Sequence, residues 1–144
     1  MSAIIEADII ENPHGDDVQI GEKHTLTITW QRGGQVGTAI ATQNIDFYQI
    51  GSLIHIEGGW SAGPTAANAT TIVASAALPS DFRPRTDVHI PIQVRDNATY
   101  GMGDLYIPAS TGIMTIGATC SPTPVAFSGN ATIGYNVRGN YIPF

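Results

Sequence analysis

Histidine and cysteine side chains are the usual carriers of catalysis and metal binding, and in this chain they are few and scattered. The histidines are His14, His24, His55 and His89, and Cys120 is the single cysteine. No histidine belongs to an H-E-x-x-H motif, the spacing that brings two zinc-binding histidines together on a helix. Cys120 lacks a neighbouring base, which favours a buried structural thiol. Local motifs therefore predict no catalytic residue and no metal site, although distant positions can still meet in a fold.

Sites for hydrolysis and nucleotide binding are not predicted either. A nucleophile elbow needs G-x-S-x-G between a strand and a helix, and no helix is expected after Gly59-Trp-Ser-Ala-Gly63. Gly101-Met-Gly103 lacks the third glycine and the following helix of a dinucleotide fingerprint. Asp96, Asn97 and Asp104 border one loop and offer the oxygen ligands that calcium takes, but their spacing does not match an EF-hand. We therefore expect a non-enzymatic protein that uses no cofactor.

Aromatic residues beside polar loops indicate a binding surface instead. Trp60 and Tyr100 adjoin glycine-rich or polar segments, where a ring can stack on a sugar while Asp and Asn side chains take its hydroxyls. The alternative for each ring is packing against the core or a subunit interface. The loop expected from Asp96 to Gly103 is the first place to look for a ligand. The candidate receptor-binding residues are Trp60, Asp96, Asn97 and Tyr100.

Short alternating segments must position these residues. The range His24–Trp30 alternates threonine with apolar residues and is the clearest strand pattern in the chain. Gly51-Ser52 suits a type II′ turn between two further strands. Pro91 within Val88–Val94 indicates an edge strand or a bulge, because proline cannot donate to a ladder. About nine or ten short strands result, a number and spacing typical of a sandwich or a barrel.

Length and charge limit the number of domains and the kinds of partner that this chain can have. A chain of 144 residues fits one domain, divided here into an N-terminal arm or stalk-proximal segment at residues 1–23 and a β-sandwich head at residues 24–144. The net charge of −6 would repel a nucleic acid. We expect neither a signal peptide nor membrane insertion, because no stretch approaches the roughly 20 apolar residues of a membrane helix. The charged fraction of 12% suits a surface partly covered by copies of itself.

A resemblance to viral fibre proteins covers roughly residues 45–116. The range Phe47–Gly58 resembles the aromatic-x-polar-Val-Gly-x-Leu-Val-x-Ile-x-Gly hairpin that is common near the C-termini of phage tail-fibre and other viral fibre proteins. Leu78-Pro79 and Phe82-Arg-Pro84, followed by Gly103–Ile107 and Gly112–Ile116, resemble the later part of the same pattern.

The resemblance implies an antiparallel jelly-roll β-sandwich, similar to the complement C1q and tumour-necrosis-factor folds, that forms a homotrimer at the tip of a fibre. The implied function is attachment of a virus or phage to a receptor on the host surface, either a glycan or a protein. The implied location is the virion, with an upstream fibre or virion protein as a further partner. The loops of such heads vary, so the resemblance transfers no ligand residues.

Two other functions stay open at this point. The chain could be a structural capsid, collar or fibre component that binds no receptor. It could also be a carbohydrate-binding module of a cellular protein. Neither composition nor motif separates these from a receptor-binding head.

Overall fold

The chain folds into β-strands joined by turns and loops, and the computed structural model describes residues 9–11, 17–33, 39–64, 70–128 and 132–143. These residues contain no α-helix, only a 3-10 turn at Ser80–Phe82, so no described helix is long and apolar enough to cross a membrane. The strands are β1 (Ile9–Glu11), β2 (Asp17–Arg32), β3 (Ala39–Ile50), β4 (Leu53–Pro64), β5 (Ile72–Ala74), β6 (Val88–Asp96), β7 (Thr99–Ile107), β8 (Thr115–Gly117) and β9 (Thr132–Tyr141).

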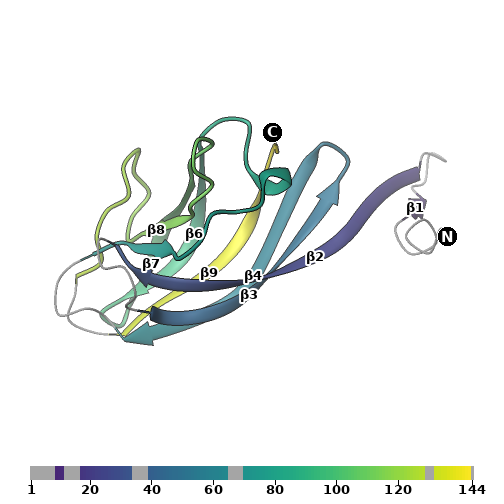
Figure 1. The fold of residues 1–144 in the computed structure, drawn as a ribbon. Helices are drawn as coiled ribbons and strands as arrows, with labels where there is room; N and C mark the ends of the chain where they lie inside the picture. Colours follow the sequence, from purple (N-terminus) through teal and green to yellow (C-terminus); the bar gives the residue numbers. More distant parts are fainter. Residues whose placement is uncertain (1–8, 12–16, 34–38, 65–69, 129–131, 144) are drawn as a thin grey trace.

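Eight of the strands close into one antiparallel barrel (Figure 1). Their order around the barrel is β2-β3-β4-β9-β6-β7-β8-β5, and β5 returns to β2 through pairs that include Trp30 with Ala74. The predicted jelly-roll sandwich is therefore wrong, whereas the all-β class is confirmed. The physical reason is that β2 pairs with β3 along most of its length and with β5 at its C-terminal end, which leaves no open edge in the barrel.

The barrel is built from two Greek keys. The strands β2, β3 and β4 follow one another, and β5 returns to lie beside β2. The strands β6, β7 and β8 repeat this arrangement, with β9 beside β6. The two units join where β4 pairs with β9 and where β5 pairs with β8.

Inward-facing apolar side chains fill the barrel, as the alternating patterns predict. On β3, Ile45 and Phe47 are fully buried, whereas the residues next to them in the strand, at 44, 46 and 48, are exposed or half-buried. The indole of Trp30 packs edge-on against Tyr135, with ring centres 5.6 Å apart. Trp30 Nε1 donates to Gln43 Oε1 at 3.0 Å, which satisfies a polar group that would otherwise be costly to bury.

The proline-rich segment 78–85 closes one end of the barrel. Leu78 is buried there, and the Phe82 ring lies 5.2 Å from that of Phe47. The hydroxyl of Tyr141 donates to the carbonyl of Phe82, which ties the end of β9 to this segment. At the same end β2 leaves the barrel toward β1, as Figure 1 shows. The N-terminal side of the described chain therefore departs from the capped end.

Two hairpin turns set the register of the strands near the candidate site. Gly51 has a φ of 59° in the two-residue turn between Ile50 and Leu53, as predicted. Asp96 pairs with Thr99, so Asn97 and Ala98 alone form the turn between β6 and β7, and both have positive φ. The loop predicted from 96 to 103 is thus wrong, because β7 already begins at Thr99.

Two further predictions concern Pro91 and the N-terminal arm. Pro91 lies beyond the last pair between β6 and β9, which is Gln93 with Asn136, so its missing N–H interrupts no ladder on that side. The division at residues 23 and 24 stays a prediction, and β2 runs across it. Residues 1–8 and 12–16 of the predicted arm lie outside the described part of the chain.

Candidate functional site

A bulge in β4 turns Trp60 out of the barrel. Ile54 and Ile56 face the core, and strict alternation would send residue 60 inward as well. The pairing of β4 with β9 shifts between Glu57 and Gly59, and the extra residue reverses the alternation, so that Trp60 is 43% exposed. The bulge thereby converts a core position into a surface position.

Gln43 holds this bulge from inside. Its amide Nε2 donates to the carbonyls of Gly58 and Gly59, at 2.8 and 2.9 Å, while its Oε1 accepts from the indole of Trp30. Gly59 has a φ of 64°, a conformation that glycine adopts without strain. One buried polar side chain therefore fixes the backbone on which Trp60 is mounted.

Trp60, Arg95 and Tyr100 form a cluster on the outer face, here called the aromatic cluster. The two rings have centres 5.9 Å apart and are inclined by 38°. The guanidinium carbon of Arg95 lies 5.9 Å from the Trp60 ring centre and 6.0 Å from that of Tyr100. These distances allow cation–π attraction to both rings, which restrains the cluster although Tyr100 is 60% exposed.

A cavity of about 350 Å³ adjoins this cluster at the β6–β7 turn. Asp96, Asn97, Thr99 and Tyr100 line it on one side, and residues of the β8–β9 connection line the other. The Asp96 carboxylate accepts from the backbone N–H of Ser128 at 2.9 Å and from its hydroxyl at 2.7 Å. Asp96 thus holds the connection against the turn, while Asn97 stands exposed at the tip.

The structure brings the four predicted site residues to one end of the barrel. Trp60 and Tyr100 are in ring contact, and Tyr100 shares the cavity with Asp96 and Asn97. Exposed rings with polar groups at their side can hold the apolar face of a sugar and bind its hydroxyls. Sequence reasoning missed Arg95. Its place on the outer face follows from the alternation of the buried residues Ile90, Ile92 and Val94.

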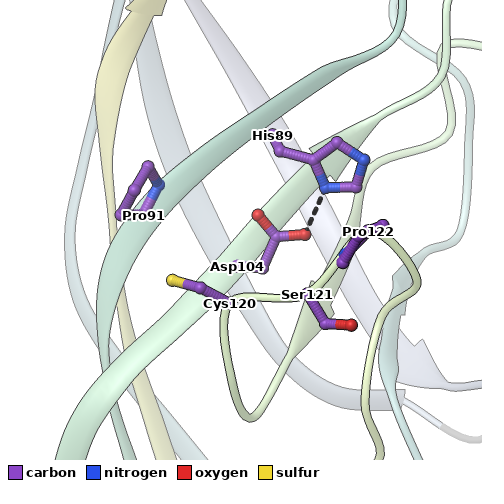
Figure 2. Close-up of a pocket in the computed structure, with 6 residues that line it drawn as sticks. All are labelled: His89, Pro91, Asp104, Cys120, Ser121 and Pro122. Carbon is purple, nitrogen blue, oxygen red and sulfur yellow. Dashed lines mark hydrogen bonds and ion pairs between the residues drawn. The ribbon is translucent and has the colours of Figure 1, made fainter.

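A second cavity, of about 440 Å³, lies farther along β6 and β7 under the β8–β9 connection. His89, Pro91, Asp104, Cys120, Ser121 and Pro122 line it (Figure 2). His89 Nδ1 lies 2.6 Å from Asp104 Oδ2, and the imidazole stacks on Tyr106 with ring centres 4.6 Å apart. Sequence reasoning did not connect these residues, although pairing Asp96 with Thr99 places Pro91 opposite Asp104.

The ring of Tyr106, on which His89 stacks, is itself held by a hydrogen bond to Asp87. Asp87 accepts hydrogen bonds from the backbone N–H of Ala109, at 2.8 Å, and from the Tyr106 hydroxyl, at 3.0 Å. The hydrogen bond from the Ala109 N–H is the main reason that the pKa of the Asp87 carboxyl is lowered, and the bond from Tyr106 is the second. The same bond to Asp87 raises the pKa of the Tyr106 hydroxyl. The support for the imidazole is therefore preformed.

Cys120 does not complete a nucleophile–base pair with His89. Its thiol donates to the carbonyl of Gly103 at 3.1 Å, and Figure 2 shows the sulfur pointing away from the imidazole. The residue is exposed, so the predicted buried thiol is wrong.

The described residues contain no group of three or more His, Cys, Asp and Glu side chains placed to hold a metal ion. Asp96, Asn97 and Asp104, the calcium ligands that the sequence suggests, do not share one site, because Asp96 accepts from Ser128 whereas Asp104 accepts from His89.

Comparison with known proteins finds a likeness in structure but none in sequence. No protein-family model matches the chain, and no curated protein matches its sequence. The fold is similar to a crystal structure of the reovirus attachment protein sigma1 in complex with α-2,3-sialyllactose, with a TM-score of 0.48 and 11% identity. The match covers 88% of this chain and 66% of the other, so this chain spans just under two thirds of that protein's resolved length.

Proposed function

We propose that this chain is the non-enzymatic head domain of a viral or phage fibre, and that it attaches the virion to a glycan on the host cell surface. The observation that carries the proposal is the aromatic cluster of Trp60, Arg95 and Tyr100 beside the cavity at the β6–β7 turn. Large aromatic rings exposed to water are unfavourable unless a ligand or partner covers them. Because Arg95 already restrains both rings, less side-chain entropy is lost when a ligand binds.

The placement of the cluster supports a fibre head. Trp60 and the β6–β7 turn lie at the end of the barrel away from segment 78–85, since Ile54 pairs with Tyr141 near that segment and Ala62 pairs with Gly134 far from it. The N-terminal part of β2 leaves from the capped end. A fibre joined to the N-terminal side would therefore present the aromatic cluster outward, toward a cell surface.

The proposal includes a homotrimer. Two large apolar side chains, Leu53 and Ile142, are 40% and 57% exposed next to the paired residues Ile54 and Tyr141. They lie at the capped end, away from the aromatic cluster. Covering them with a second and third copy would bury apolar area near the fibre and leave the binding end free.

A glycan array tests the proposal. The intact chain should bind a limited set of glycans, and Trp60→Ala and Tyr100→Ala should each weaken binding to the best of them by about tenfold or more, because each removes a stacking surface. Tyr48→Ala is the matched control, since it removes a tyrosine on β3 outside the cluster. Wild-type affinity in both cluster variants, or a chain that binds cells but no glycan, would overturn the proposal.

A further inference from the structure

The outer face of β6 and β7 forms one continuous strip from the aromatic cluster to the cavity at His89 and Asp104. Cross-strand pairs follow one another along it, with the intervening pairs facing the core. The outward pairs, in order from the turn, are Arg95 with Tyr100, Gln93 with Met102, Pro91 with Asp104, and His89 with Tyr106. Tyr100 and Asp104 are four positions apart, a rise of about 13 Å. The aromatic cluster and the second cavity are therefore the two ends of a single surface.

Asp104 is buried although it belongs to this outer face. Only 2% of the residue is exposed, compared with 56% of Met102 on the same face of the same strand. The difference arises because the β8–β9 connection crosses the sheet at this point, where Cys120 bonds to the carbonyl of Gly103. Burying a carboxylate is costly unless it is paired, and here the partner is His89.

The pairing prepares His89 to bind a hydroxyl group. A carboxylate only accepts hydrogen bonds, so the imidazole donates to Asp104 through Nδ1. In the neutral ring Nε2 is then an acceptor. The Ser121 hydroxyl adds a donor and acceptor, and Pro91 and Pro122 supply apolar walls to the same cavity. This combination suits a ring that carries hydroxyls on its edge and C–H groups on its face.

We propose that the cavity at His89 and Asp104 is a second sugar subsite, and that the ligand is an oligosaccharide long enough to reach it from the aromatic cluster. The inference rests on the proposed glycan binding and specifies its substrate class. Gln93 and Met102 lie between the two subsites, where an amide and an apolar side chain can contact the intervening sugars. A monosaccharide covers one subsite only.

Cys120 gives a direct probe of the second subsite, because it is the single cysteine of the chain, is exposed, and lines the cavity. The array's best oligosaccharide and its shorter terminal fragments are added at saturation, and alkylation of Cys120 by iodoacetamide is followed by mass spectrometry. The long glycan should slow alkylation several-fold, and a fragment that occupies only the aromatic cluster should leave the rate unchanged. Equal rates with and without the long glycan would overturn the second subsite.

A pair of substitutions separates this inference from the proposed function. Ser121→Phe fills the cavity from the connection and should weaken binding of the long glycan at least tenfold, with no effect on the short fragment. Thr123→Phe, an exposed change in the same connection outside the cavity, is the control. Trp60→Ala should weaken both ligands. Equal loss of both ligands in Ser121→Phe contradicts the second subsite alone, whereas a wild-type chain that binds neither ligand contradicts both proposals.

Discussion

The indole of Trp60 lies directly over Gly134, the residue of β9 that pairs with Ala62 and Arg95. A β-carbon at position 134 would come within 2.1 Å of Trp60 Cζ2, far closer than two carbon atoms can approach. The ring therefore rests on bare backbone. Its position depends on a residue with no side chain as much as on the bulge that turns β4.

Replacing Gly134 should move Trp60 and weaken ligand binding. In Gly134→Ala the new methyl group occupies the space of the indole, so the ring has to turn away from Tyr100 and Arg95. We expect affinity for the glycan to fall by about tenfold, comparable to loss of an aromatic anchor. Titration calorimetry measures this, and Tyr48→Ala on β3, outside the aromatic cluster and the cavity, is the control. Unchanged affinity in Gly134→Ala would contradict the role given to the ring.

Gln43 should contribute strongly to the stability of the barrel. Gln43→Leu leaves the Trp30 N–H and the carbonyls of Gly58 and Gly59 without their partner, which should cost about 2–4 kcal/mol in the free energy of unfolding. Gln49→Leu, on an exposed position of the same strand, should cost little. Urea denaturation compares the two variants. Equal stabilities would show that Gln43 does not hold the bulge.

The barrel should lose stability in strong alkali through Tyr135. Burial raises the pKa of Tyr135 to about 12, so between pH 10 and 12 the folded chain keeps a proton that the unfolded chain releases. Rising pH then favours unfolding over this range, by up to about 2–3 kcal/mol. Chemical denaturation across pH 9–12 should give a shallower decline for Tyr135→Phe than for the wild type. Parallel curves above pH 10 would contradict this assignment.

How far the sequence could predict the structure depends on the range of the contacts involved. Alternation located most of the strands, and Gly51 marked its turn, because both signals are local. Closure of the barrel depends on Trp30 meeting Ala74 on the short strand β5, a pairing between distant segments that no local pattern indicates. The polar loops suggested Trp60 as a binding residue, but its outward direction depends on a bulge held by Gln43 from another strand. The pair His89 and Asp104 needed the register of the whole β6–β7 hairpin.

The trimer proposal gives a further prediction. Light scattering at micromolar concentration should report three times the 15.2 kDa mass of one chain. The double variant Leu53→Ser with Ile142→Ser should shift the mass toward the monomer, since it removes the exposed apolar side chains at the capped end. Met102→Ser, an exposed apolar residue on the binding face, is the control and should leave the mass unchanged. A wild-type chain that stays monomeric contradicts the trimer.

A co-crystal structure with the strongest glycan from the array shows directly whether the aromatic cluster binds the ligand. We expect a sugar ring packed on Trp60 and Tyr100, with Arg95 still beside both rings and further sugars running along β7 toward His89. A glycan bound elsewhere on the barrel, with the aromatic cluster free of ligand, would contradict this expectation.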